Sequence, residues 1–146
     1  MKNYQVILVA VDFSEHVDVV LSRAVSMAQG HKAAINLAHV VEYMPPMVMG
    51  DEPLSIAAWP VDDDKLLELA RQQMQVLADK YSLNDAPVHI ELGRPVHQLC
   101  QIASECNADL IIAGSHGRRG IDRLLGSTAS ALVHKTPCDL LLVKIK

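Results

Sequence analysis

Aromatic residues are scarce in this chain of 146 residues, which has one Trp, three Tyr and one Phe. Since half of the residues are apolar, the core must be filled mainly by aliphatic side chains, as is usual for a parallel sheet covered by helices. Basic residues are also outnumbered, and the formal net charge is −4. A general nucleic-acid binder would show a basic face with stacking aromatics, so no nucleic-acid partner is expected.

Cysteine is equally sparse, and no apolar run reaches the length of a membrane span. Cys100, Cys106 and Cys138 form an odd number without CxxC spacing, which favours a reducing compartment and a packing role for all three. Met1–Gln5 leads into a strand-like segment without the regions of a signal peptide. About 18 consecutive apolar residues would be needed to cross a bilayer. We therefore expect a cytoplasmic protein without a membrane partner.

Apolar periodicity predicts five strands that alternate strictly with four helices. The expected strands are Val6–Val11, Ala34–Val41, Pro87–Leu92, a run ending at Ala113, and Cys138–Ile145. The expected helices are Glu15–Gln29, Lys65–Tyr81, Val96–Glu105, and one from Ser127 or Thr128 to His134, which these two residues are expected to cap. Strict alternation indicates an α/β fold with a doubly wound parallel sheet and helices on both faces, formed by a single domain over residues 1–146. Ligands of such sheets bind beyond the carboxyl ends of the strands, where the strand order reverses.

Local signals predict where these helices begin and end. Ser14 is the expected N-cap of the first helix, and Gly30 is expected to end it. Asp62–Asp64 supplies caps for the second helix, whose buried face is expected to include Leu69. No metal site is expected at this acidic triplet, because no other ligands accompany it. His39 is expected to be a near-core residue with a backbone partner.

The segment between the second strand and the second helix, Glu42–Val61, carries four prolines. Prolines at this density exclude a regular element, so the segment is predicted to be a long irregular connection. Its apolar content suggests that it packs against the domain, a ligand or a second subunit, and the sequence does not separate these three.

The richest stretch for chemistry runs from Gly114 to Thr128, at the predicted carboxyl end of a buried strand. Free N–H groups and the helix dipole at such a loop suit a phosphate. Three arginines of this stretch either grip phosphate or form a solvated face, and both readings stay open; they are Arg118, Arg119 and Arg123. Asp12, which follows the first strand, either holds a ligand hydroxyl or helps to cap the next helix.

Ser115 and His116 are neighbours in the same stretch and invite a hydrolase interpretation. Adjacent residues on one loop rarely reach each other as nucleophile and base, and no GxSxG elbow is present. We therefore predict no catalytic residue, and we expect the His116 ring to face a phosphate or solvent.

Several segments together resemble the universal stress protein family. They are Val9–Glu15, His39–Val41, Gly114–Gly117 and Leu124–Ser127, followed by a closing strand. The resemblance spans essentially the whole chain. It implies the strand order 3-2-1-4-5 and, for the nucleotide-binding branch, ATP or another adenine nucleotide such as AMP, with Mg²⁺.

The resemblance also assigns roles to particular positions. Asp12 would contact the nucleoside and Val40 would meet adenine through its backbone, while glycines and Ser127 would cradle ribose and phosphates. The candidate nucleotide-binding residues are Asp12, Val40, Gly114, His116, Gly117, Arg118, Gly126, Ser127 and Thr128. One feature departs from the family pattern, because eight residues separate Gly117 from Gly126 where nine are usual. A missing residue would shift a helix register by about 100°.

Two classes of function remain open at this point. The first is a nucleotide-binding regulatory module of the stress response, at most with slow ATP hydrolysis or self-phosphorylation on a residue such as Ser127. The second is a dimeric stress-response protein that acts through partners without nucleotide. The apolar last strand, Cys138–Ile145, is an edge in the implied order and predicts a homodimer, since exposed apolar edges are usually covered.

Overall fold

The computed structural model describes residues 3–42, 62–116 and 126–146, and within them strands and helices alternate as predicted. The strands are β1 (Val6–Ala10), β2 (Ala34–Glu42), β3 (Val88–Gly93), β4 (Leu110–Gly114) and β5 (Asp139–Val143). The helices are α1 (Val17–His31), α2 (Asp63–Lys80), α3 (Pro95–Glu105) and α4 (Ser127–Lys135). Residues 43–61 of the predicted irregular connection lie outside the described residues.

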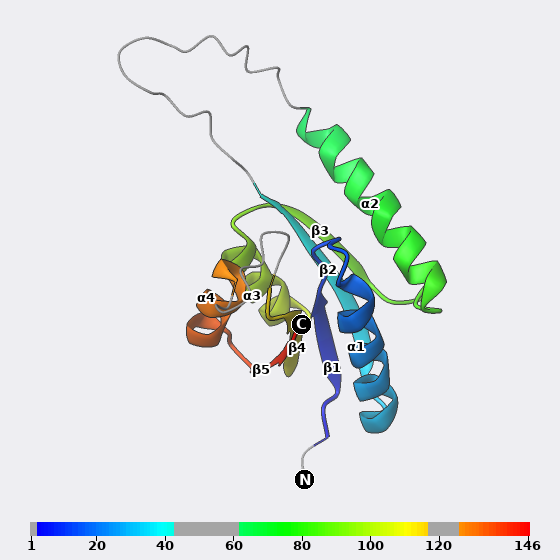
Figure 1. Ribbon diagram of the computed structural model, residues 1–146, viewed down its shortest axis with the longest axis vertical. Coiled ribbons are helices and arrows are strands. Elements are labelled where there is room, and N and C mark those ends of the chain that lie inside the picture. The colour runs from blue at the N-terminus through cyan, green and yellow to red at the C-terminus, as the bar shows by residue number, and fades with distance from the viewer. Residues whose placement is uncertain (1–2, 43–61, 117–125) are drawn as a thin grey trace.

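The strands form a five-stranded parallel sheet in the order β3-β2-β1-β4-β5, with helices on both faces (Figure 1). The predicted fold class and strand order are therefore confirmed. β1 lies at the centre, where Ile7 pairs with Ile35 of β2 and Val9 pairs with Ile112 of β4. Since layers of helix cover both faces of this strand, its sequence is a continuous apolar run.

Two apolar clusters fill the space between the sheet and its helices. Successive residues of a strand point to opposite faces, so Ile7 and Val9 belong to one cluster and Leu8 to the other. The first cluster lies under α1 and α2, and the second lies under α3 and α4 (Figure 1). The three free cysteines are partly buried against the second cluster, and burial raises the pKa of each thiol. The predicted packing role of the three cysteines is therefore confirmed.

The ends of α1 differ from the prediction. His16 is the N-cap residue, and the Ser14 hydroxyl instead accepts the His16 N–H at 3.2 Å, because the chain makes an extra turn before the helix. The helix also continues through Gly30 and ends at Lys32, which adopts a left-handed φ of 55°. The Lys32 N–H donates to the carbonyl oxygens of the last turn, so it is this residue that closes the helix.

The start of α2 agrees with the prediction, and one face residue does not. Asp62 accepts the N–H groups of Asp64 and Lys65 at 3.1 and 3.4 Å and so caps the helix. Leu69 is 50% exposed, because the buried stripe of α2 runs through Ala70, Met74 and Ala78 at four-residue spacing. The prediction that Leu69 lies on the buried face is therefore wrong.

β3 does not bury every second residue equally. Ile90 packs against the first cluster, but Val88 is 43% exposed on this edge strand.

Met74 tests the packing of α2, since its side chain is fully buried. We expect Met74→Ala to lower the free energy of unfolding by about 2–5 kcal/mol, because it removes apolar contacts and leaves a cavity. Val76, 66% exposed on the same helix, is the matched control, and Val76→Ala should change stability by less than about 0.5 kcal/mol. Urea denaturation measures both, and equal effects of the two substitutions would contradict this packing.

Candidate functional site

The candidate site lies where the chain leaves β1 and β4. These strands are neighbours, but β1 continues into α1 on one face of the sheet and β4 leads to α4 on the other (Figure 1). The two connections diverge, and this is the switch point at which open α/β sheets bind ligands. Asp12 follows β1, while Ser115 and His116 follow β4, so the fold brings the predicted residues of both segments to one edge.

A tight turn after β1 positions Asp12. One carboxylate oxygen, Oδ1, accepts the N–H of Ser14 at 3.0 Å. Phe13 has a left-handed φ of 54°, and its ring lies 4.3 Å from that of His39. Asp12 therefore organises its own turn and does not cap α1. Its other oxygen has no hydrogen bond to any described residue, which leaves a partly buried acceptor at the switch point.

His39 supports this turn from β2. Its Nδ1 lies 2.6 Å from the carbonyl oxygen of Val11, which confirms a near-core position with a backbone partner. Val11 donates its N–H to Ala38 O at 2.8 Å, so the backbone of Ala38 faces β1. Since these groups alternate along a strand, the N–H and C=O of Val40 also point to the β1 side. β1 ends at Ala10, and the Val40 backbone therefore faces the crevice, while its side chain is buried.

Ser115 joins three segments at the end of β4. Its N–H donates to Val143 O of β5 at 2.9 Å, and its hydroxyl oxygen accepts the N–H of Ile145 at 3.0 Å. Its carbonyl oxygen accepts the N–H of Gly126 at 2.9 Å, just before α4. Ser115 is 6% exposed, and its hydrogen bonds tie the end of β4 to β5, to Ile145 and to the start of α4. Sequence reasoning missed this role, since a lone serine beside a glycine carries no signal for it.

Contrary to the prediction, Ser115 and His116 do contact each other. Ser115 Oγ lies 3.0 Å from His116 Nδ1. Because the hydroxyl oxygen already accepts from Ile145, its hydrogen is available for Nδ1. In the tautomer that uses this hydrogen, the imidazole carries its proton on Nε2. The serine is a bridge between the imidazole and the backbone of Ile145, and burial keeps it from acting as a nucleophile.

The other nitrogen of His116, Nε2, is buried and has no hydrogen-bond partner among the described residues. A buried donor without an acceptor costs about 1–3 kcal/mol, so such an atom usually serves a ligand or water. The ring thus offers a donor next to the start of α4.

The start of α4 is not capped by a side chain. Gly126 is the N-cap residue, with φ −56° and ψ 156°, and the prediction that Ser127 or Thr128 caps the helix is wrong. Ser127 and Thr128 are instead the first two residues of the helix, so neither occupies the N-cap position. Their N–H groups at this end are left for water or an anion.

Gly114 has a structural reason for being glycine. A Cβ placed there would lie 3.3 Å from His116 O and 3.4 Å from Val20 Cγ2. A side chain at this position would therefore crowd the backbone of His116 and the Val20 side chain of α1. Gly117 and Arg118 lie outside the described residues, as does the spacing of eight before Gly126. Across residues 3–42, 62–116 and 126–146, no group of three or more potential ligands could hold a metal ion.

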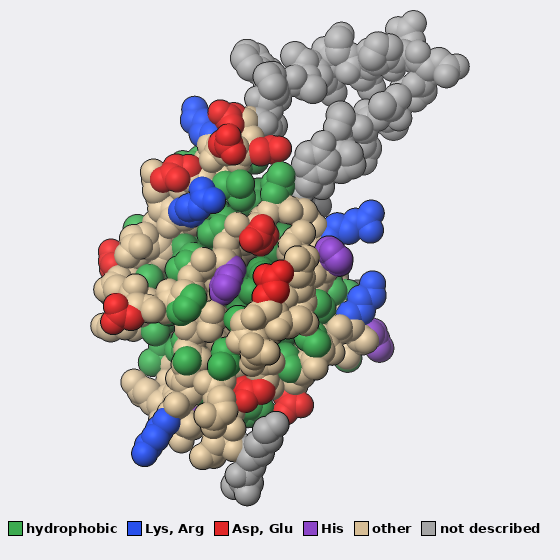
Figure 2. Space-filling model, turned by 180° about the vertical axis from the view of Figure 1, so that it is seen from behind, with side chains coloured by type: hydrophobic (Ala, Val, Ile, Leu, Met, Phe, Trp, Pro, Cys, Tyr) green, Lys and Arg blue, Asp and Glu red, His purple; other side chains and the backbone are tan. Residues whose placement is uncertain are grey.

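The surface gives further information on the same described residues. Figure 2 shows acidic and basic side chains interspersed with apolar ones over one face, so the coloured part of this face carries no continuous basic surface. Among the described helices, none is long and apolar enough to cross a membrane.

Comparison with known proteins identifies the family. The model of the universal stress protein family matches residues 3–144. The chain belongs to the universal stress protein family. Two curated relatives from Coxiella burnetii, universal stress protein A homologs 1 and 2, are 32% and 33% identical. These alignments cover 99% and 100% of this chain, respectively, and 99% of each relative.

Several solved structures share the fold, and two of the three described next are universal stress proteins. The protein UspA from Lactobacillus plantarum is 27% identical, with a TM-score of 0.72 over 98% of this chain and 99% of that one. The hypothetical protein MJ0577 is 27% identical, with a TM-score of 0.78 over 99% of both chains. A universal stress protein solved in complex with cAMP is 24% identical, with a TM-score of 0.68 over 98% of both chains.

Ser115 tests how the loop after β4 is held. We expect Ser115→Ala to lower the free energy of unfolding by about 1–3 kcal/mol, because the Ile145 N–H would lose its acceptor inside the protein. Ser26→Ala, at an exposed position of α1, is the control and should be nearly neutral. Urea denaturation gives both values, and a fully stable Ser115→Ala variant would refute the bridging role.

Proposed function

We propose that this universal stress protein is a regulatory module that binds an adenine nucleotide, ATP or AMP, at the switch point between β1 and β4. The observation that carries the proposal is the unpaired Nε2 of His116, a buried donor beside the uncapped start of α4. A phosphate oxygen would accept from this nitrogen and from the N–H groups of Ser127 and Thr128. One anion would then satisfy donors that the protein itself leaves unpaired.

The other side of the crevice suits the nucleoside. Asp12 offers a carboxylate oxygen to a ribose hydroxyl, and the backbone of Val40 offers a donor and an acceptor of the kind that an adenine edge needs. The fold holds both positions rigidly, because Asp12 is fixed by its turn and Val40 lies in the sheet. Phosphate and nucleoside groups therefore have separate partners in this arrangement.

Mg²⁺ would accompany a nucleoside triphosphate rather than occupy a protein site of its own. The described residues bring no cluster of ligands together, and magnesium commonly binds through substrate phosphates and water. A universal stress protein has been solved with cAMP, an adenine nucleotide, but that relative is 24% identical and its likeness shows the fold alone. The proposal rests on the residues of this chain.

Nucleotide binding is tested by substituting both sides of the crevice. We expect His116→Ala and Asp12→Ala each to weaken binding of ATP about tenfold or more. The first removes the donor to a phosphate oxygen, and the second removes the carboxylate that accepts from a ribose hydroxyl. Isothermal titration calorimetry with Mg-ATP, and with AMP, measures the affinities. His134→Ala, at an exposed position of α4, is the control and should bind as the unsubstituted chain does.

A folded unsubstituted chain that binds neither nucleotide would refute the proposal. It would favour instead the alternative of a stress-response protein that acts through partners alone. Urea denaturation of each variant separates a lost contact from a lost fold.

We further propose that the protein forms a homodimer through its last strand, within Cys138–Ile145. Val143 O accepts from the N–H of Ser115, the residue after β4, so the alternation of the ladder points the backbone groups of Leu140 and Leu142 away from β4. Leu140, Leu141 and Leu142 are only partly buried at this edge. Pairing with the same strand of a second copy would cover them.

The dimer is tested at Leu142. Leu142→Pro removes an outward N–H without removing a hydrogen bond to β4, and we expect it to shift the protein from dimer to monomer at micromolar concentration. Leu142→Ala loses similar side-chain contacts but keeps the N–H, so it serves as the control and should remain dimeric. Sedimentation equilibrium measures the masses, and a monomeric unsubstituted chain would contradict this dimer.

A further inference from the structure

The opposite edge of the sheet, β3, also has an open side. Within the described residues its ladder partner is β2 alone. Pro87 O accepts the N–H of Leu37 at 2.9 Å, so the backbone of Pro87 faces β2 and the direction alternates from there. The N–H and C=O groups of Val88, Ile90 and Leu92 therefore point away from the sheet. They form a row of donors and acceptors that another strand could pair with.

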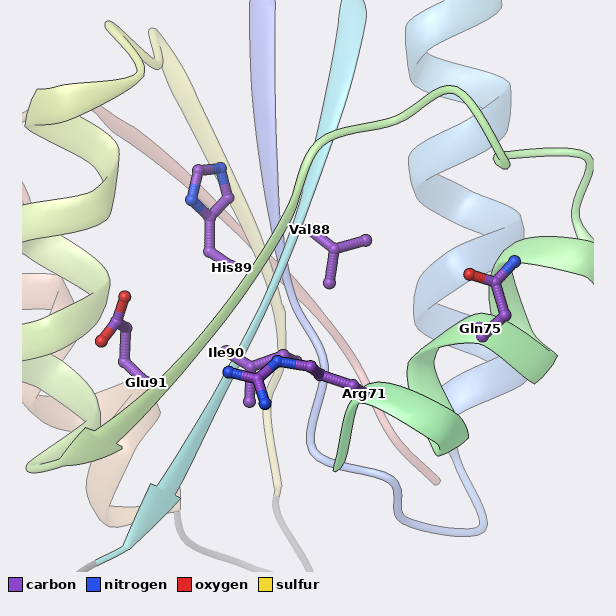
Figure 3. Close-up of a pocket in the computed structure, with 6 residues that line it drawn as sticks. All are labelled: Arg71, Gln75, Val88, His89, Ile90 and Glu91. Atoms are coloured by element: carbon purple, nitrogen blue, oxygen red, sulfur yellow. The ribbon is translucent and has the colours of Figure 1, made fainter. Parts of the chain in front are cut away.

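A groove of about 360 Å³ lies along this edge (Figure 3). Its lining residues are Arg71 and Gln75 of α2 and Val88, His89, Ile90 and Glu91 of β3. Figure 3 shows Arg71 extending from α2 toward Ile90, while His89 and Glu91 project to the side of α3. The groove provides space beside β3, between the layers of the fold, where the sheet would continue.

Within its bounds, β3 lacks two of the features that usually prevent pairing at an edge, lysine and proline. Natural edge strands are protected by lysines, prolines, bulges or a covering element. β3 has the sequence VHIELG without a lysine, and Pro87 lies before its first residue. Val88 is 43% exposed at the start of the strand.

We propose that β3 pairs antiparallel with β3 of a second copy of this chain, about a twofold axis that passes through Ile90. In this register Ile90 opposes Ile90 of the second copy, and Val88 opposes Leu92. These are the residues whose backbone groups point outward, so each opposed pair exchanges both of its N–H to O=C hydrogen bonds. The outward backbone groups of β3 can therefore all pair with those of β3 in a second copy.

The side chains fit the same register. His89 opposes Glu91 of the second copy, and symmetry repeats this pair on the other side of the axis. Pairs without backbone hydrogen bonds bring their side chains closest together, with Cα atoms about 4.5 Å apart. His89 Nε2 lies 3.0 Å from Asn36 Oδ1, which anchors the ring on this face of the sheet. A histidine and a glutamate in direct opposition attract each other.

The neighbouring registers are worse. Opposed residues of an antiparallel pair share a face, so the axis must pass through a residue and not between two residues. An axis through Glu91 would oppose two carboxylates, which is destabilising. An axis through His89 would oppose two histidines and leave Glu91 without a histidine opposite it. Among these registers, only the one centred on Ile90 pairs unlike polar groups.

Val88 provides the first test. Val88→Pro removes an outward N–H and leaves the hydrogen bonds to β2 intact, while Val88→Ala shortens the side chain and keeps the N–H. We expect Val88→Pro to weaken this association about tenfold or more, and Val88→Ala to change it little. Sedimentation equilibrium of the full chain over a range of concentrations measures the association. Circular dichroism confirms that each variant is folded.

Charge exchange provides the second test. Glu91→Lys and His89→Glu each remove the attraction between the opposed side chains, so each variant alone should associate less. A mixture of the two should associate again, because each chain then supplies the charge that its partner lacks. Glu105→Lys, at an exposed position of α3, makes the same charge change away from β3 and should not alter association.

Restored association in the mixture supports the pairing, because a merely misfolded variant would not be rescued by another. Two results would overturn it. The first is an association state that Val88→Pro leaves unchanged, which would mean that copies of the chain meet elsewhere. The second is a mixture that associates no better than its components, which would leave this edge to a strand of another protein. β5 lies at the opposite edge, so Leu142→Pro tests that interface separately.

Discussion

The central strands of this sheet are buried on both faces, and the rest of the structure depends on this constraint. β1 and β4 need cover from helices on each side, so the chain that leaves them must pass to opposite faces. The divergence opens a crevice at the carboxyl ends of the strands and brings together residues distant in sequence. Asp12 and His116 lie at the same end of the sheet because β1 and β4 are neighbouring strands, and neither local segment alone places them together.

Ser115 shows how backbone satisfaction turns such an edge into a defined site. Its three polar groups connect the end of β4 to β5, to Ile145 beyond β5 and to the start of α4. With these bonds made, the imidazole of His116 is oriented through Nδ1, and its remaining nitrogen has no acceptor in the part of the chain that the structure describes. The stability of the loop and the binding property that we propose thus come from the same residue.

The two edges of the sheet present a separate physical problem from the crevice. Each edge strand exposes a row of backbone groups, and neither β3 nor β5 contains an internal proline or lysine within its bounds. The pairings proposed for the two edges involve different residues and different ends of the strand order. The nucleotide binding and the two associations that we propose therefore use different residues.

The sequence by itself determined the fold class, the alternation of elements and the site segments, because burial on two faces leaves continuous apolar runs and turn residues mark their ends. The strand order and the family came from the resemblance of several segments taken together. Local signals failed where tertiary contacts decided the outcome: Lys32 ends α1 in place of Gly30, and Leu69 faces outward. Only the tertiary structure decided the role of Ser115, since its partners Val143, Ile145 and Gly126 come from other segments, and a pattern along the chain carries no record of such contacts.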